Sequence, residues 1–358
     1  MKIKRSIDSI SRSIKKSVKE AGHIKFEGQE RVLIPSGSAL MNLMLSDSSL
    51  GAYVPGTIVN IVGDSSSGKT FLLWTIFAEM AKMDSAFRQY RLIYDETESA
   101  FFFDAHRLFG IEEKRVERSI RSETVQDFQK NVLVAIEKKQ PFIYGLDSLD
   151  ALSTLEEKAR MHKMVTKDEI DGSYKTEKPK LMSELLRNIT RSIENTQSIV
   201  FIVSQTRDNI GVMFGEKKTR SGGRALRFYC THELWLAIKS HEKNKEREIG
   251  VNVIAKTKKN KLTGKLRRVE FPIYYDYGVD DIGSIIDFLV DEKYWRKERD
   301  IIYGQIGGVC LDGRKRKLID MIEVNAMEEE LMKEVEIVWL KIEEEIKTHR
   351  KPRYTMNE

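Results

Sequence analysis

Residues 63–70 of the chain read Gly63-Asp64-Ser65-Ser66-Ser67-Gly68-Lys69-Thr70, and this stretch decides the fold. An apolar run typical of a strand, residues 57–62, precedes it, and an apolar run typical of a helix, residues 71–78, follows it. The spacing fits G-x-x-x-x-G-K-[ST], a loop whose backbone N–H groups surround phosphates while the lysine reaches the β- and γ-phosphates and the Thr hydroxyl binds Mg²⁺. The stretch therefore predicts a nucleoside triphosphate site made by Gly63 to Thr70 and Phe71; a glycine turn with an exposed lysine is the alternative.

The composition is that of a globular protein rather than a membrane or secreted one. The 358 residues, 41% hydrophobic and 32% charged, suffice for one large α/β domain with small appendages. No apolar run approaches the roughly 18 residues that span a bilayer, and the first residues lack the apolar core of a signal peptide. The two cysteines, Cys230 and Cys310, fit a reducing compartment and argue against a disulfide framework or a zinc site. We expect a cytoplasmic protein without a membrane partner.

The net charge of +6 is unevenly distributed along the chain. Residues 207–268 hold 17 Lys or Arg against 6 Asp or Glu, whereas residues 321–347 hold 9 Glu against 3 Lys. A concentrated basic segment is typical of a surface that binds a polyanion, which predicts a nucleic-acid partner. A solvated charged face is the alternative.

Two further strand-like runs end in carboxylates. One leads into Asp95-Glu96-Thr97-Glu98, and the other ends at Asp147. Carboxylates at the C-terminal ends of parallel strands beside a phosphate loop are placed to orient water or Mg²⁺, so we expect Thr70 and Asp147 to hold the metal. An acidic surface turn and a simple helix cap are the alternatives, and Ser148 and Asp150 also suit caps of a following helix.

The remaining apolar segments predict a doubly wound α/β fold. Residues 198–204 are typical of a fourth buried strand, and helices separate the strands, so a mostly parallel twisted sheet flanked by helices is the economical architecture. Residues 162–182 mix charges, Gly and Pro without periodicity and predict a mobile surface loop. Two more strands, residues 251–256 and 268–274, enclose a basic hairpin.

Both ends of the chain carry smaller units. The first twenty residues repeat Ile or Val at helical spacing with Lys and Arg between them, which predicts an amphipathic helix, followed by a polar connector at residues 20–29. The last part predicts a small α/β or helical domain with an acidic terminal helix. The predicted division is an N-terminal helix and linker at 1–33, a nucleotide-binding core at 34–280 and a C-terminal domain at 281–358.

A long loop, residues 205–223, combines glycines, cations and an apolar tip. Met213-Phe214 lies between Gly211 and Gly215. Such a loop is unusual if connection is its only role. The cations would contact DNA phosphates and the tip would insert between bases, whereas a tip buried in a domain interface is the alternative. The residues that we assign to DNA binding are Arg207, Gly211, Val212, Met213, Phe214, Lys217, Lys218, Arg220, Gly222 and Gly223.

These motifs together resemble the RecA-type recombinases. The segments 204–215 and 221–229 are similar to that family's second DNA-binding loop and subunit-interface helix, and Lys259-Asn260-Lys261 is similar to its paired lysines. The segment from Asp147 to Leu152 resembles the family's Mg²⁺-proximal strand end. The similarity extends from about residue 34 to 275, and the combination is far more specific than the phosphate loop alone.

The resemblance implies a RecA-like ATPase core that uses ATP and Mg²⁺. It implies that Glu98 activates the attacking water, that Lys69 contributes to catalysis, and that Gln205 senses the γ-phosphate and signals to the DNA loop. It further implies that Lys259 and Lys261 reach ATP from the next subunit. Residues 162–182 would be the first DNA-binding loop, and the N-terminal helix would dock on a neighbouring subunit. The implied partners are single-stranded DNA, double-stranded DNA and further copies of the chain in a helical filament.

Three positions depart from the family pattern. Ala105 stands where a Tyr stacks on adenine, Glu233 stands where a basic residue is found, and Glu96 lies two residues from Glu98 and competes with it for the catalytic role. Such divergence around a retained motif core resembles a phage-encoded member, which would act in the cytoplasm of the host cell.

Three functions fit the sequence. The first is a DNA-dependent ATPase that forms filaments on single-stranded DNA and promotes homologous pairing and strand exchange. The second is a ring-forming helicase or remodelling ATPase of the same superfamily. The third is a nucleotide-gated protein that coats single-stranded DNA or mediates its loading, with little hydrolysis.

Overall fold

The computed structural model describes residues 23–26, 29–82, 85–99, 104–118, 120–167, 177–208, 218–220 and 223–350. The predicted amphipathic helix of the first twenty residues lies outside these ranges. The predicted polar connector is in part wrong, because β1 (His23–Phe26) pairs antiparallel with β2 (Gln29–Val32) to form a hairpin. Ile24 and Phe26 alternate with polar residues, which is the period of a strand.

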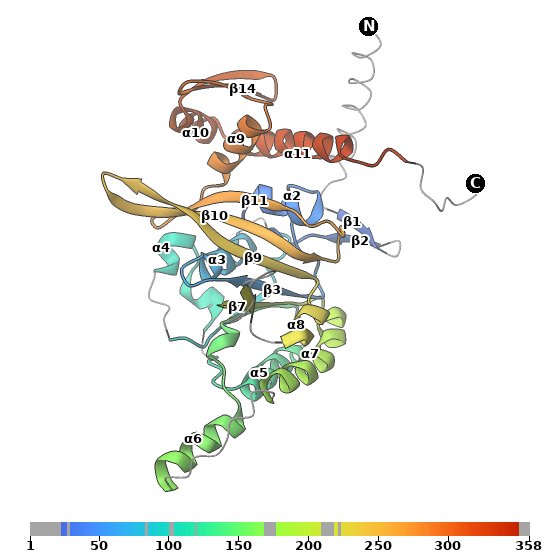
Figure 1. The fold of residues 1–358 in the computed structure, drawn as a ribbon. Coiled ribbons are helices and arrows are strands. Elements are labelled where there is room, and N and C mark those ends of the chain that lie inside the picture. The colour runs from blue at the N-terminus through green and yellow to red at the C-terminus, as the bar shows by residue number, and fades with distance from the viewer. Residues whose placement is uncertain are drawn as a thin grey trace, which may run out of the picture.

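A ten-stranded, mostly parallel sheet forms the centre of the molecule (Figure 1). Its main path runs β12-β11-β10-β9-β3-β7-β6-β4-β5, and β8 pairs with β7. The strands from β9 to β5 pair in parallel, whereas β10, β11 and β12 are antiparallel. This confirms the predicted α/β fold class. The strands are β3 (Thr57–Gly63), β4 (Arg91–Glu96), β5 (Val116–Glu117), β6 (Phe142–Asp147), β7 (Ile199–Asp208), β8 (Lys218–Arg220), β9 (His232–Asn244), β10 (Arg247–Asn260), β11 (Arg268–Tyr274) and β12 (Gly278–Val279).

Helices cover both faces of the sheet because successive residues of the central strands are apolar. In β7, Val200 and Ile202 belong to the core cluster under α5 and α7, whereas Phe201 and Val203 belong to the cluster under α3. A strand buried on both faces reads as a continuous apolar run, which is why β3, β6 and β7 are visible in the sequence. The helices of this part are α2 (Ala39–Ser46), α3 (Lys69–Ala81), α4 (Ala105–Phe109), α5 (Val125–Glu137), α6 (Leu155–Lys167), α7 (Glu177–Asn195) and α8 (Gly223–Tyr229), with 3-10 turns at Glu113–Arg115 and Leu149–Ala151.

Residues 162–182 differ from the predicted mobile loop. Helix α6 extends through residue 167 and α7 begins at Glu177, so only residues 168–176 of the predicted loop lie outside the described residues. The start of α6 is a capping box: the Glu157 N–H donates to the Thr154 hydroxyl at 3.1 Å, and the Glu157 carboxylate accepts from the Thr154 N–H at 3.0 Å. The charged composition of α6 concealed this signal.

The strands β9 and β10 form a ribbon that is longer than the sequence predicted. Residues 251–256 were expected as a strand, but β10 covers 247–260 and pairs with all of β9. The outer half of the ribbon is exposed and charged and projects beyond the sheet (Figure 1). A strand exposed on both faces carries no alternation of apolar and polar residues, so the pattern gave no sign of it.

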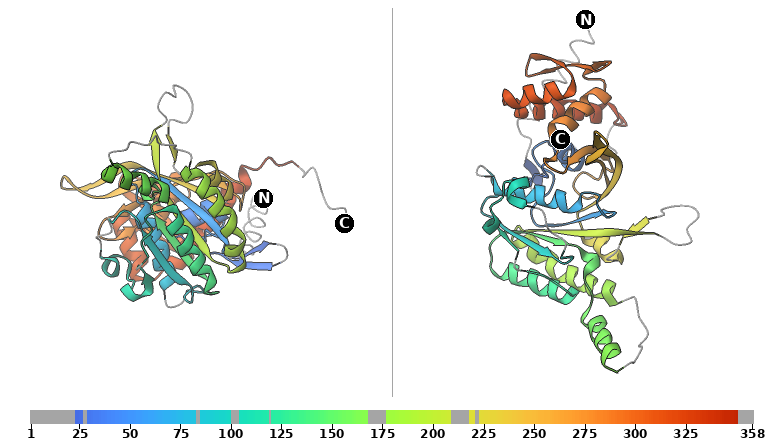
Figure 2. Two further views of the ribbon diagram at one scale, coloured as in Figure 1. Left: turned by 90° about the horizontal axis from the view of Figure 1, so that it is seen from below. Right: turned by 90° about the vertical axis from the view of Figure 1, so that its left-hand side faces the viewer.

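The C-terminal unit is α/β, which decides between the two forms predicted for it. It combines three helices with a three-stranded antiparallel sheet at one end of the molecule (Figure 2). Its apolar residues join the core cluster that also contains those of α2 and α3. Gly304 allows the close packing, because a Cβ there would lie 2.3 Å from Cδ2 of Trp295. The elements are α9 (Asp281–Asp291), β13 (Arg296–Glu298), β14 (Ile301–Ile306), β15 (Val309–Gly313), α10 (Lys315–Val324) and α11 (Glu328–Glu345). Among all described residues, no helix combines the length and apolarity needed to cross a membrane.

Arg267, in the turn between β10 and β11, connects the C-terminal unit to the core. Its guanidinium lies 2.6 Å from the Asp47 carboxylate at the end of α2 and 2.5 Å from the Glu343 carboxylate on α11. It also stacks over the Trp339 ring at 5.2 Å. Since the Arg267 side chain is 11% exposed, these contacts are largely shielded from water.

His232 is fully buried where β9 lies between β3 and β10. It pairs in register with Val59 on one side and with Asn260 on the other, and its ring packs edge-on against Tyr53 at 5.8 Å. Burial lowers the pKa of His232 to about 4, so the imidazole is neutral at physiological pH.

We expect His232 to make stability depend on pH. A histidine held neutral by folding contributes stability that is present above its ordinary pKa of 6.5 and is lost as the pH falls toward its folded pKa of about 4. Between about pH 7.5 and about pH 4.5, the free energy of unfolding of the wild type should fall by about 2.5 kcal/mol more than that of His232→Gln. Urea unfolding at both pH values measures this difference. Equal losses in the two proteins would contradict a buried neutral imidazole.

Candidate nucleotide-binding site

The loop from Gly63 to Thr70 joins the end of β3 to the start of α3. Its bends require positive φ angles, 61° at Ser66 and 87° at Gly68. Gly63 is required by close approach, because a Cβ there would lie 2.3 Å from the Ser67 hydroxyl and 2.8 Å from the Leu236 carbonyl oxygen. The two glycines of the motif thus suit the backbone path, and Lys69 is the first residue of α3.

The Lys69 side chain folds back over the loop. Its ammonium donates to the backbone carbonyl of Asp64 at 2.5 Å, and the residue is 8% exposed. Burial lowers the pKa of Lys69, and the charges of Asp147 and Glu98 oppose that shift. The cation therefore lies in a largely dehydrated position that has carboxylates around it.

Asp147, at the end of β6, connects the phosphate loop to the neighbouring strands. Its carboxylate accepts from the Thr70 hydroxyl at 2.6 Å and from the Tyr94 hydroxyl at 3.0 Å. Burial raises the pKa of Asp147, and these two hydrogen bonds oppose the shift. The two residues predicted to hold the metal, Thr70 and Asp147, are thus in direct contact.

Glu98 and Gln205 meet beside this pair. The Gln205 side-chain amide donates to the Glu98 carboxylate at 3.0 Å, and the Ser148 hydroxyl also donates to it. The Gln205 N–H in turn donates to the Asp150 carboxylate at 2.6 Å. Ser148 and Asp150, for which the sequence suggested helix caps, therefore contact two of the three predicted catalytic residues, Glu98 and Gln205. The peptide between Asp147 and Ser148 is cis.

The structure distinguishes the two competing glutamates. Glu98 is exposed, whereas the Glu96 side chain is 7% exposed and pairs with Arg121, whose guanidinium lies 3.2 Å away. Glu96 lies opposite Asp147 in register. Of the two, only Glu98 faces Gln205 with an accessible carboxylate, which favours it as the group that contacts water.

Asp95 points to the opposite face of the sheet and has a structural role. It is fully buried and accepts from the Ser122 N–H at 2.8 Å, the Ser122 hydroxyl at 2.6 Å and the Tyr144 hydroxyl at 2.5 Å. Burial raises its pKa, and these three hydrogen bonds oppose the shift. Within the run Asp95-Glu96-Thr97-Glu98, Asp95 therefore has a structural role, whereas Glu98 contacts Gln205.

Lys259 and Lys261 lie far from the phosphate loop of their own chain. Asn260, between them, pairs with His232, which pairs with Val59 near the start of β3. The loop begins at Gly63, four residues further along β3, or roughly 13 Å at the rise of a strand. The Lys259 ammonium instead donates to the carbonyls of Arg227 and Phe228 at the end of α8, at 2.8 Å from the latter.

The predicted DNA-binding residues fall into two groups. Gly211, Val212, Met213, Phe214, Lys217 and Gly222 lie outside the described residues. The strands that lead to this loop are described: Thr206, Arg207 and Asp208 of β7 pair antiparallel with Arg220, Thr219 and Lys218 of β8. This two-stranded stem shows that residues 205–208 and 218–220 belong to strands rather than to a long loop.

Three of the predicted DNA-binding residues in the described part of the chain have different surroundings. Arg207 is 60% exposed and lies 3.3 Å from the Asp150 carboxylate. Gly223 begins α8 with a φ of 64°. Arg220, only 7% exposed, forms a buried ion pair at 2.9 Å with Glu233, and Glu233 also accepts from the Trp235 indole N–H at 3.0 Å. The acidic residue at position 233 therefore has a partner in the same chain, and the Arg220 guanidinium is directed inward.

An aromatic contact and a small cavity lie beside the start of α3. The ring of Phe71, a predicted nucleotide-binding residue, packs on the ring of Phe109 of α4, with 5.3 Å between the ring centres. Both side chains pack against the hydrophobic core. Ala105, the first residue of α4, borders a cavity of about 220 Å³ that Trp74 and Arg118 also line. The small side chain leaves this space open where the family pattern has a Tyr.

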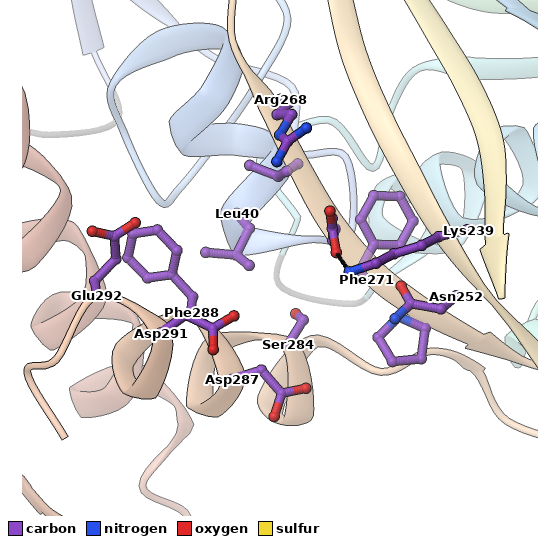
Figure 3. A pocket seen from close by; sticks show the side chains of 13 residues that line it. Leu40, Lys239, Asn252, Arg268, Phe271, Ser284, Asp287, Phe288, Asp291 and Glu292 are labelled. Atoms are coloured by element: carbon purple, nitrogen blue, oxygen red, sulfur yellow. Dashed lines mark hydrogen bonds and ion pairs between the residues drawn. The ribbon is translucent and has the colours of Figure 1, made fainter. Parts of the chain in front are cut away.

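A larger cavity, of about 430 Å³, lies between α9 and the strands β10 and β11 (Figure 3). The Lys239–Glu270 ion pair lies on one side of it, and Asp287, Asp291 and Glu292 come from α9 on the other. None of the predicted site residues lines it. The predicted residues Lys69, Thr70, Asp147, Glu98 and Gln205 lie at the phosphate loop instead.

The residues at the loop fit a nucleoside triphosphate with Mg²⁺. The close backbone approach at Gly63 and the positive φ at Gly68 give the loop the shape on which backbone N–H groups hold phosphates. Thr70 and Asp147 offer oxygen ligands, which Mg²⁺ prefers together with phosphate oxygens. Lys69 supplies a positive charge already directed at an oxygen of the loop.

Comparisons with known proteins agree with this geometry. Residues 147–280 match the family model described as the RecA N-terminal domain. Protein RecA of Geobacter sulfurreducens is 30% identical over 263 residues, which are 72% of this chain and 72% of the relative. Protein RecA of Roseiflexus castenholzii is 30% identical over 278 residues, 74% of this chain and 70% of the relative. Protein RecA of Trichodesmium erythraeum is 28% identical over 325 residues, 88% of this chain and 84% of the relative.

Proposed function

The chain belongs to the RecA family of recombinases, and from this premise we propose that it hydrolyses ATP in a DNA-dependent way and promotes pairing and strand exchange in filaments on single-stranded DNA. One observation carries the proposal: Gln205 donates to Glu98 at 3.0 Å and stands at the base of the β7–β8 stem that leads to the predicted DNA loop. A movement of Glu98 would be passed through this hydrogen bond to Gln205, and so to the strand that leads to the predicted DNA loop.

Hydrolysis would proceed through Glu98 as general base. Its carboxylate is exposed and oriented by Ser148 and Gln205, so it can accept a proton from a water placed beside the phosphate loop. Thr70 and Asp147 would hold Mg²⁺, which, when bound with ATP, neutralises phosphate charge. Lys69 would stabilise negative charge from the opposite side.

The paired lysines support assembly of the site from two subunits. Lys259 and Lys261 lie at the opposite end of the central strand from the phosphate loop, so they do not reach the loop of their own chain. A head-to-tail arrangement would bring them to the loop of the next copy, and repetition of that contact generates a filament or a ring.

The recombinase activity is tested directly by a D-loop assay. With ATP, Mg²⁺ and a homologous single strand, the protein should form joint molecules, and electron microscopy with a non-hydrolysable ATP analogue should show helical filaments on the single strand. Binding should weaken steeply as salt rises, because cations on the protein displace counterions from phosphates. Hexameric rings with directional unwinding, or neither filaments nor joint molecules, would overturn the proposal.

Glu98→Gln should lower the DNA-stimulated ATPase rate by about 100-fold or more, since the amide cannot accept the proton. Glu96→Gln is the matched control. It removes the same charge two residues earlier in the chain, from a side chain that pairs with Arg121, and this variant should retain most of the ATPase rate. Steady-state phosphate release with and without single-stranded DNA measures both. An unchanged rate in Glu98→Gln would make Glu96 the candidate for the general base. If the wild type also hardly hydrolyses ATP, the result would favour a protein that coats DNA.

Mixing two inactive variants should restore activity if the site is shared. Lys69→Ala damages the phosphate loop, and the double variant Lys259→Ala, Lys261→Ala damages the other half. In an equimolar mixture about a quarter of head-to-tail contacts combine the two intact halves, so the ATPase rate should recover to about a quarter of the wild type. A mixture as inactive as its components would contradict a shared site.

A further inference from the structure

Arg121 occupies a position at the nucleotide site that none of the motifs predicts. It lies in the connection between β5 and α5, at the same edge of the sheet as the ends of β4 and β6. Its guanidinium lies 3.2 Å from the Glu96 carboxylate. The Glu96 side chain is 7% exposed and the Arg121 side chain is 60% exposed, so the pair stands between the sheet edge and solvent.

The backbone of this connection is fixed by the residue next to Arg121. Ser122 donates both its N–H and its hydroxyl to Asp95, which is fully buried. Asp95 and Glu96 are consecutive on β4 and point to opposite faces of the sheet. Asp95 therefore holds Ser122, and Glu96 holds the neighbouring Arg121. The buried Asp95–Ser122 contact thus fixes the backbone beside Arg121.

The site has an excess of negative charge that this arginine offsets. The carboxylates of Asp147, Glu98, Asp64 and Asp150 all act on Lys69. Glu96 lies opposite Asp147 on the adjacent strand, and neighbouring strands are about 4.8 Å apart. Without the positive charge of Arg121, the carboxylate of Glu96 would add to the negative charge near the place where a triphosphate must bind.

We infer that Arg121 is a positioning residue of the nucleotide site, which neutralises Glu96 so that the phosphates meet less repulsion and Glu98 remains the accessible carboxylate. This inference rests on the proposed nucleotide binding at Gly63 to Thr70. An ion pair with one exposed partner contributes little to stability, so its main effect is on charge at the site. Arg121 acts through Glu96 and not through contact with the nucleotide.

The test compares equilibrium binding of a non-hydrolysable ATP analogue with Mg²⁺ to full-length variants. Arg121→Gln should weaken binding by about 5- to 10-fold, as expected for the loss of one positive charge several ångströms from the phosphates. Arg121→Lys keeps the charge and should bind within about 2-fold of the wild type. Adding Glu96→Gln to Arg121→Gln should restore the affinity, because the charge that causes the repulsion is then gone.

Arg91→Gln is the matched control. Arg91 pairs with Glu117 of β5 at 2.7 Å, but it lies at the start of β4, five residues from Glu96. Its loss should leave the affinity for the analogue unchanged, and urea unfolding of every variant shows whether the fold is intact.

The possible results separate the role of Arg121 from the proposed nucleotide site. Unchanged affinity in Arg121→Gln, or the same loss of affinity in Arg91→Gln, would overturn the inference and leave nucleotide binding standing. A double variant as weak as Arg121→Gln would also overturn it, since Arg121 would then act on the phosphates directly. If the wild type does not bind the analogue, and Lys69→Ala is no different from it, the nucleotide site itself is wrong and the role of Arg121 fails with it.

Discussion

The register of the parallel strands is the constraint on which the site depends. Gly63 lies opposite Gln205 on β7, and Asp147 lies opposite Glu96 on β4. Because parallel strands end at the same edge of the sheet, this pairing brings the phosphate loop, the amide and the carboxylates together without any one helix having to aim them. A shift of one residue would turn each of these side chains to the other face, and the buried apolar residues on both faces prevent it.

The same strand that belongs to the core also leads out of it. The first half of β7 is buried between helices on both faces, and its last residues leave the parallel sheet to pair with β8. Gln205 stands at this transition, bonded to Glu98 through its side chain and to Asp150 through its backbone. Thr206 adds a contact from its hydroxyl to Asp64 of the phosphate loop. The stem is therefore attached to the nucleotide site at successive residues, and it cannot tilt without disturbing at least one of these hydrogen bonds.

The parts of the fold that could be predicted are those with a local signal. The phosphate loop is a contiguous motif, and the carboxylates follow apolar runs that mark buried strands, so the meeting of Thr70 with Asp147 follows from short segments and one topology rule. The roles of Glu98 and Gln205 were implied by the resemblance to the RecA-type recombinases. The pairs Arg121–Glu96 and Arg220–Glu233 join residues whose neighbours in sequence carry no sign of a partner. The outer half of the β9–β10 ribbon has no buried face, so it lacks the alternation by which a strand is recognised. Arg220 was assigned to DNA from the composition of its loop, which gave no sign of the buried ion pair that it forms with Glu233.

The turn after β10 links two distant parts of the molecule. Lys259, near the end of β10, and Lys261, at the start of the turn, contact the end of α8. Lys265 and Arg267, at the end of the turn, contact Asp47 and Glu343. Asn260 reinforces the link, since its side-chain amide donates to the Leu45 carbonyl of α2 at 2.9 Å. Because the Arg267 contacts are largely shielded, a displacement of α11 relative to the core must either carry the turn with it or break an ion pair in a partly dehydrated place, which is costly. The turn therefore couples the two lysines to the C-terminal unit. The position of α11 restricts the position of Lys259 and Lys261.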